Sequence, residues 1–110
     1  SHPVLGKSWE GFVIENILST LPAGAETYFY HTAAGAEIDL IVKFPNSALW
    51  AIEIKKGSAP KISKGFHQAC EDIHATQKYV IYGDDDEFPI KNNTIVISLR
   101  KLMSEINRLF

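Results

Sequence analysis

Apolar positions recur along the chain with two periods, and these periods predict its helices and strands. A spacing of three to four residues, typical of helices with one buried side, marks three segments: 8–21, 62–76 and 100–110. Runs rich in β-branched and aromatic residues mark five predicted strands: 27–32, 36–44, 49–55, 78–82 and 94–99. The predicted order is therefore α-β-β-β-α-β-β-α.

The connections between these segments predict how the strands pair. A short turn containing Gly35 joins the first two strands, which favours an antiparallel hairpin. Between residues 49 and 82 a strand, a helix and a strand follow one another, an order typical of parallel pairing through a right-handed crossover. We therefore expect an α/β fold in which a mixed central sheet is flanked by helices.

Length and composition fit one domain that covers residues 1–110. The chain has 110 residues, 45% of them hydrophobic and 22% charged, which suffices for a core without disulfides or a structural metal. Ser1 and His2 are interpreted as a tag remnant. The single cysteine, Cys70, excludes an internal disulfide and suits a reducing cytoplasm, where we expect the protein to act. No apolar run is long enough to span a membrane and no signal peptide is visible, so we expect no membrane partner.

Charge is unevenly distributed, although the net charge of -2 excludes a strongly basic nucleic-acid-binding protein. The segment 54–70 has no acid and holds four lysines, the candidate contacts to nucleic acid: Lys55, Lys56, Lys61 and Lys64. The segment 71–87 holds six acids and one lysine. One face could therefore attract phosphate while the molecule stays acidic overall. Two solvated segments of opposite sign are the simpler interpretation.

Two motifs that suggest a binding site are set aside. Gly6-Lys7-Ser8 is similar to the end of a phosphate-binding P-loop, but Ser1 stands where that motif needs glycine. His67, Glu71 and His74 share one side of the second predicted helix at a spacing that can bind zinc. A solvated helix face is the favoured interpretation of these three residues.

Glu10 places a charge on the apolar side of the first predicted helix. The polar side of this helix is marked by Ser8, Gly11, Glu15 and Ser19, and Glu10 lies away from it. A carboxylate on the core-facing side is costly unless it is paired or binds a metal, which favours a buried role for Glu10. An acid that complements the dipole at the helix start is the alternative.

Two further acids interrupt predicted strands. Asp39 and Glu53 are embedded in runs of strong strand formers, although acids are poor strand formers themselves. Strict alternation along 36–43 places three apolar side chains on the side opposite to Asp39: Ile38, Leu40 and Val42. Helices on both sheet faces would bury both acids, whereas one open face would leave them solvated. Solvation is the simpler interpretation of each acid taken alone.

Taken together, these residues supply the groups needed for metal-assisted phosphodiester hydrolysis. One acid lies on one predicted strand, and an acid and a lysine lie two residues apart on the next; the two carboxylates can hold Mg²⁺. The metal would polarise the phosphoryl oxygen and lower the pKa of the attacking water. The Lys55 ammonium would orient that water or stabilise the charge that develops.

The spacing of these residues resembles a known motif. Asp39, thirteen intervening residues and Glu53-Ile54-Lys55 resemble the PD-(D/E)xK motif of the restriction-endonuclease-like nuclease superfamily. The α-β-β-β-α-β core of that superfamily resembles the predicted order through residue 82. Six segments are similar to one branch, the domain of unknown function at the end of many prokaryotic AAA-type ATPases: 6–13, 30–32, 35–39, 52–55, 63–66 and 79–83. The resemblance implies that the chain is the C-terminal part of a longer ATPase chain.

The resemblance implies a metal site. Asp39 and Glu53 would bind Mg²⁺ or Mn²⁺, and the backbone carbonyl of Ile54 would be a third ligand. Glu10 resembles the extra acid that many members carry on the first helix, which binds the metal directly or through water.

The resemblance also implies roles outside the metal ligands. Lys55 would be the catalytic lysine, and Gln68 falls where some members place a helical glutamine near the site. Ala36 stands where the motif commonly has proline, a departure that the superfamily tolerates widely.

The favoured function is a metal-dependent nuclease domain that hydrolyses phosphodiester bonds in DNA and is attached to an AAA-type ATPase. The complete set of acids and lysine favours it, because a pure scaffold has no need of these costly side chains. The alternative is a catalytically silent nuclease-like domain that regulates the ATPase or mediates its interactions, which the acidic balance favours. The choice between DNA and RNA stays open, as does a homodimer of the kind common among nucleases that cut both strands.

Overall fold

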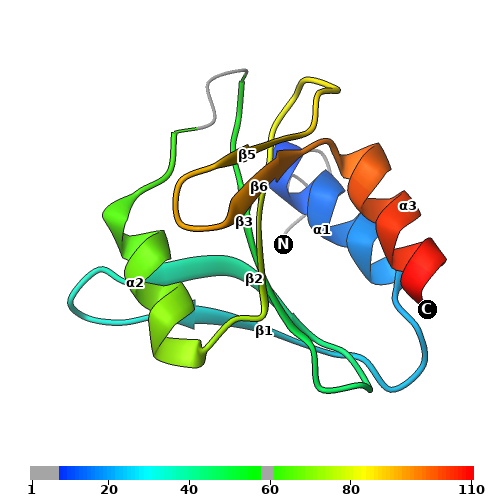
Figure 1. Cartoon of the computed structure of the whole chain (residues 1–110), viewed down its shortest axis with the longest axis horizontal. Helices are drawn as coiled ribbons and strands as arrows, with labels where there is room; N and C mark the ends of the chain where they lie inside the picture. The colour runs from blue at the N-terminus through cyan, green and yellow to red at the C-terminus, as the bar shows by residue number, and fades with distance from the viewer. Residues whose placement is uncertain (1–7, 58–60) are drawn as a thin grey trace.

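The computed structural model describes residues 8–57 and 61–110, which form one mixed sheet with helices packed on it (Figure 1). In chain order the elements are α1 (Trp9–Thr20), β1 (Glu26–His31), β2 (Glu37–Lys43), β3 (Leu49–Ile54), α2 (Lys64–Ile73), β4 (Gln77–Ile81), β5 (Phe88–Ile90), β6 (Thr94–Ile97) and α3 (Leu99–Leu109). The predicted helices and strands are confirmed to within three residues at each end. Hydrophobic periodicity missed β5, because a run of 3 residues that contains Pro89 resembles a loop.

The strands lie in the order β1-β2-β3-β4-β6-β5 within this sheet. β2 is antiparallel to both β1 and β3, β4 runs parallel to β3 and β6, and β5 is antiparallel to β6. The predicted hairpin, the predicted parallel crossover and the mixed α/β fold are therefore confirmed. β5 tolerates its proline because it forms an edge of the sheet.

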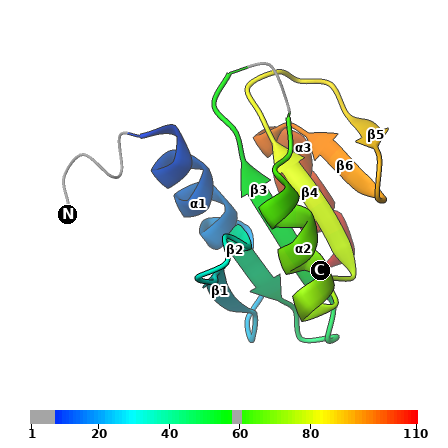
Figure 2. The ribbon, with the colours of Figure 1, turned by 90° about the vertical axis from the view of Figure 1, so that its left-hand side faces the viewer.

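Helices cover both faces of the sheet (Figure 2). On one face, here the α1/α3 face, Val13 of α1 and Ile106 of α3 join a core with Ile52. On the other, the α2 face, Phe66 packs with Ala51. Because both faces are covered, a polar side chain on a central strand is shielded from water.

The helices are short, and a serine caps the start of each. The Oγ atoms of Ser8, Ser63 and Ser98 accept hydrogen bonds of 3.0, 3.2 and 3.1 Å from the backbone N–H three residues later. Ser8 therefore caps α1, which agrees with setting aside the P-loop; Gly6, Lys7 and the expected tag remnant lie outside the described residues. Within the described ranges no helix is long and apolar enough to cross a membrane.

β2 contains a bulge that the hydrophobic pattern does not predict. Ile41 pairs with Tyr28 and Ile38 pairs with Tyr30, so β2 advances three residues while β1 advances two. The extra residue of β2 lies between these two pairs. A bulge of this kind bends the strand and redirects the side chains around it.

The bulge makes the predicted alternation along β2 wrong. Ile38 packs on the α2 face together with Ile41, whereas Leu40 and Val42 pack on the α1/α3 face. One extra residue inverts the period of two, so that even-numbered positions before the bulge face the opposite way from those after it. Asp39 lies at this inversion, so the regular alternation of the strand does not determine the direction of its side chain.

Candidate functional site

Asp39 and Glu53 lie where β2 and β3 stop pairing. The ladder between these strands runs from Lys43 opposite Leu49 to Leu40 opposite Ile52, and both acids follow directly beyond its last pair. The Oδ2 atom of Asp39 accepts a 2.8 Å hydrogen bond from the backbone N–H of Ile54. The carboxylate of one strand thus holds the backbone of the next, and this contact brings the two predicted acids to one place.

Glu53 is a buried carboxyl whose polar atoms are only partly paired. It is 6% exposed, and its Oε2 atom has no hydrogen-bond partner. The nearest cation is the Nζ atom of Lys55, 3.6 Å away and itself one-third exposed. A buried polar atom left without a partner is unfavourable and calls for a functional explanation.

Both acids hold their protons more tightly than usual. Burial raises the pKa of Asp39, partly opposed by the Ile54 N–H, while Glu37 raises it further and Lys55 lowers it. Burial likewise raises the pKa of Glu53; Lys55 opposes this shift and Asp39 adds to it. A divalent cation between the two carboxyls would favour their charged forms and reverse both shifts.

Glu10 is exposed, so the predicted burial of its side chain is wrong. The fully buried side chains of α1, Val13 and Ile17, follow one and two turns later, and the first turn lies at the margin of the core. The carboxyl nevertheless approaches the site: partial burial raises its pKa, and Asp39 and Glu37 raise it further. Together with Asp39 it lines a hollow of about 340 Å³.

Trp9 fixes the start of α1 to the end of β3, a role that sequence reasoning missed. Its indole Nε1–H donates a 2.8 Å hydrogen bond to the backbone carbonyl of Lys55. The Lys55 N–H donates to the Ile81 carbonyl at 2.8 Å, so the backbone of the predicted catalytic lysine is held on both sides. Trp9 looks like an ordinary core position in sequence, and only its place directly before Glu10 hints at this contact.

Gln68 and the lysines predicted to contact nucleic acid do not form one cluster. Gln68 is exposed and donates a 3.0 Å hydrogen bond to Asp72 within α2, so this bond does not tie it to the carboxyl pair. Lys56, Lys61 and Lys64 are also exposed. Lys56 lines a small hollow beside Glu10, whereas Lys64 lines a different one together with Gln68. The roles predicted for these residues stay predictions.

The second metal hypothesis, on α2, has no cluster to support it. His67 lies 3.4 Å from the side-chain amide of Asn92, and His74 ends the helix in a left-handed conformation with φ of 57°. Across residues 8–57 and 61–110 there is no group of three or more His, Cys, Asp or Glu side chains that could hold a metal ion. A cation at Asp39 and Glu53 would therefore bind to two carboxylates and draw its other ligands from backbone, water or substrate.

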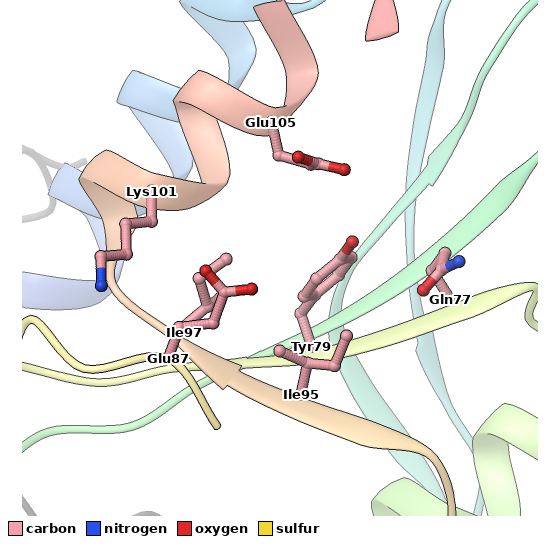
Figure 3. A pocket seen from close by; sticks show the side chains of 7 residues that line it. All are labelled: Gln77, Tyr79, Glu87, Ile95, Ile97, Lys101 and Glu105. Atoms are coloured by element: carbon pink, nitrogen blue, oxygen red, sulfur yellow. The ribbon is translucent and has the colours of Figure 1, made fainter. Parts of the chain in front are cut away.

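A separate polar hollow lies under α3, and the sequence predicted none of its residues as part of a site (Figure 3). It encloses about 210 Å³ and is lined by Gln77, Tyr79, Glu87, Ile95, Ile97, Lys101 and Glu105. Figure 3 shows the Tyr79 hydroxyl directed toward the space beneath Glu105. Burial, Glu105 and Glu87 together raise the pKa of Tyr79 to about 12.

Comparison with known proteins identifies the family of the chain. It is 31% identical over 103 residues to an uncharacterized protein of Mycobacterium bovis, Mb2031c, and equally to an uncharacterized protein of Mycobacterium tuberculosis, Rv2008c. The match covers 94% of this chain but only 23% of each relative. No solved structure matches it. Residues 5–102 match the domain of unknown function DUF4143, and the chain belongs to that family.

Proposed function

We propose that the chain is a metal-dependent nuclease domain of the restriction-endonuclease-like type, which hydrolyses phosphodiester bonds in DNA. The observation that carries the proposal is the buried Glu53 carboxyl, whose Oε2 atom has no hydrogen-bond partner and whose neighbour Asp39 also has a raised pKa. Two acids of this kind are unfavourable unless a cation compensates their charge. Carboxylate oxygens just beyond the last pair of the β2–β3 ladder suit a hard divalent cation.

The donor set fits Mg²⁺ or Mn²⁺. Asp39, Glu53 and the Ile54 carbonyl would hold the cation, and Mg²⁺ commonly binds through one or two carboxylates while it keeps water and substrate phosphate as other ligands. The Ile54 N–H holds Oδ2 of Asp39, which orients this carboxylate before any cation binds. When bound, the cation would polarise the phosphoryl oxygen and supply an activated water.

Lys55 is suited to orient the attacking water or to stabilise the charge that develops on phosphate. Its backbone is fixed by Trp9 and Ile81, and its ammonium lies 3.6 Å from Oε2 of Glu53 while still in contact with solvent. A preorganised ammonium at this place stabilises the transition state more than the ground state. Glu10, which shares a hollow with Asp39, would act on the cation through water.

The domain would work as part of a larger protein. The chain spans about a quarter of the length of the curated relatives it matches, 23% in each case. The resemblance of its motifs to the domain at the end of AAA-type ATPases makes an ATPase module the proposed remainder. A catalytically silent regulatory domain is the second candidate, favoured by the structural hydrogen bond that already engages Asp39.

Calorimetric titration of Mg²⁺ and Mn²⁺ tests the metal site, and cleavage of labelled DNA tests the activity. Asp39→Ala should lose metal binding and reduce cleavage about a thousandfold, equivalent to about 4 kcal/mol of transition-state stabilisation. Lys55→Ala should retain metal binding while cleavage falls. Glu71→Ala, which removes an exposed acid of α2, is the matched control and should match the unaltered protein.

The outcomes separate the two candidate functions. Metal binding that Asp39→Ala abolishes, together with cleavage that depends on Lys55, supports the nuclease. Unchanged cleavage in Asp39→Ala would refute the assignment of the site. Absence of both metal binding and cleavage in the unaltered protein would favour the silent regulatory domain.

A further inference from the structure

Phe29 is an aromatic side chain left in solvent beside the candidate site. It is 83% exposed, whereas the other exposed large hydrophobic side chains among the described residues are 42% to 49% exposed. Within residues 8–57 and 61–110 the Phe29 ring contacts no other aromatic ring. Its ring is therefore available to a ligand that enters the hollow it lines together with Glu10 and Asp39.

The neighbours of Phe29 on β1 have ordinary structural roles. Tyr28 donates a 2.9 Å hydrogen bond to Glu26, and Tyr30 donates one of 3.0 Å to Asp72 of α2. Both hydroxyls are satisfied by these contacts. Phe29 alternates with them along the strand and therefore projects toward the opposite side, away from α2.

The bulge of β2 brings Phe29 and Asp39 to one hollow. The extra residue of β2 lies between the pairs Tyr28–Ile41 and Tyr30–Ile38, opposite the Phe29 position. The hollow of about 340 Å³ is lined by Phe29 as well as by Asp39 and Glu10. A molecule that contacts the ring thus lies next to the carboxyl proposed to bind the metal.

We propose that this hollow accepts an unpaired DNA strand and that the Phe29 ring stacks on one of its bases, an inference that rests on the proposed nuclease function. Aromatic rings bind single strands by stacking on bases, because every base offers a flat face regardless of sequence. In a duplex these faces are covered by neighbouring base pairs, so an exposed ring finds no partner there. Phe29 is thereby a residue that selects the substrate.

The charge of the hollow disfavours a duplex more than a single strand. The hollow is acidic, because Glu10, Glu37 and Asp39 line it and no lysine or arginine does. A duplex presents two rows of phosphates and is bound mainly through lysine and arginine contacts to them. A single strand has a lower charge density and gains contact by stacking its bases, and the cation proposed at Asp39 would offset the acids of the hollow.

Fluorescence anisotropy with a labelled oligonucleotide tests the inference, with Ca²⁺ in place of Mg²⁺. The same strand is used alone and annealed to its complement. We expect the single strand to bind at least about tenfold more tightly than the duplex, and Phe29→Ala to weaken its binding about tenfold, the effect of one lost base stack. Phe29→Trp should retain the affinity. Phe12→Ala removes an exposed aromatic that does not line the hollow, and it should leave binding unchanged.

Other outcomes overturn the inference. Equal affinity for strand and duplex, no binding of either, or equal losses in Phe29→Ala and Phe12→Ala each exclude stacking at this site. A dimer in sedimentation that Phe29→Ala dissociates without loss of DNA affinity would assign the exposed edge of β1 to self-association instead. Failure of the proposed function gives a different result. Phe29-dependent binding of the single strand without cleavage in Mg²⁺ or Mn²⁺ refutes the nuclease alone. Cleavage of a duplex at the same rate by the unaltered protein and by Phe29→Ala refutes only this inference.

Discussion

Glu53 and Tyr79 are buried to the same extent on opposite faces of the sheet, yet burial affects them differently. They lie on the neighbouring strands β3 and β4 and are 6% and 5% exposed. Burial is the largest cause of the raised pKa of each. The Tyr79 phenol is uncharged at neutral pH with or without burial, whereas a glutamate in the unfolded chain is charged. The same burial therefore destabilises the fold at neutral pH only at Glu53.

The surroundings of the two groups sharpen this difference. Near Tyr79, Glu105 is held by Arg108 through hydrogen bonds of 3.1 and 2.6 Å, so the acid beside the phenol is paired. Near Glu53 the only cation within 4.0 Å among the described residues is Lys55, and Oε2 is left without a hydrogen bond. Packing alone explains Tyr79, whereas the unpaired Glu53 carboxyl is what the proposed cation would compensate.

Saturating Mn²⁺ should stabilise the chain through Glu53 and not through the hollow of Tyr79. A ligand that binds only the folded state, at a hundred times its Kd, adds about 2.7 kcal/mol to the free energy of unfolding. We expect this gain in the unaltered protein and in Tyr79→Phe, and its loss in Glu53→Gln. Thermal unfolding with and without Mn²⁺ measures it. An equal gain in Glu53→Gln would show that the ion binds elsewhere.

Gly65→Ala should destabilise the fold by about 2 kcal/mol because it pushes α2 away from the sheet. A Cβ atom at residue 65 would collide with the backbone carbonyl of Gly35, and crowding against backbone costs about this much. Because α2 covers the face that buries Glu53, the displacement should admit water and lower the Glu53 pKa toward its ordinary value. Urea unfolding and a carboxyl titration by NMR measure the two effects.

Gly83→Ala is the matched control for Gly65→Ala. Its Cβ would lie 3.6 Å from the nearest atom, the carbonyl oxygen of Gly57, which is ordinary contact. We expect this variant to keep the stability of the unaltered protein and its Glu53 pKa. Equal stability of the two alanine variants would mean that α2 can move without cost. It would contradict the conclusion that close packing of α2 on the sheet keeps Glu53 buried.

Glu53→Gln should raise the free energy of unfolding by about 1 kcal/mol at pH 7 and change it little at pH 4. The folded-state pKa of Glu53 lies above its ordinary value of 4.5, so the folded chain binds this proton more tightly than the unfolded chain. The unaltered protein therefore loses stability as the pH rises from about 4.5 through the folded-state pKa, and the loss is constant above it. Urea unfolding at both pH values checks this, with the exposed Glu71→Gln as control. A variant less stable at pH 7 contradicts it.

The order of helices and strands is predictable from the sequence because local rules determine it. Apolar spacing, serine caps and the turn at Gly35 act over a few residues, and both the antiparallel hairpin and the parallel crossover follow from them. β5 escapes these rules, since Pro89 and a length of 3 residues give it no period. The bulge in β2 escapes them too, because it depends on the pairing with β1 and not on either strand alone.

The candidate site is predictable only where the residue type itself is informative. The positions of Asp39 and Glu53 among strand formers lead to the carboxyl pair, and the structure brings the two together. Burial of Glu10 is not predictable from a helical wheel, because the wheel does not show that the first turn lies at the margin of the core. The contact from Trp9 to Lys55 joins residues 46 positions apart, and no local pattern encodes it.

Tyr79→Phe should change the free energy of unfolding by less than about 0.5 kcal/mol. The ring packs in the α1/α3 core, 5.1 Å from the Trp50 ring, and a phenylalanine keeps that packing. The hydroxyl makes no hydrogen bond within residues 8–57 and 61–110, so its removal leaves no partner unsatisfied. Urea unfolding at pH 7 should thus separate this variant from Glu53→Gln, since one removes a neutral group and the other a buried charge. A loss above about 1 kcal/mol would show that the phenol hydroxyl makes a stabilising contact of its own. Tyr79 and Glu53 would then both have a polar group that contributes to stability, and the contrast between the two faces of the sheet would be lost.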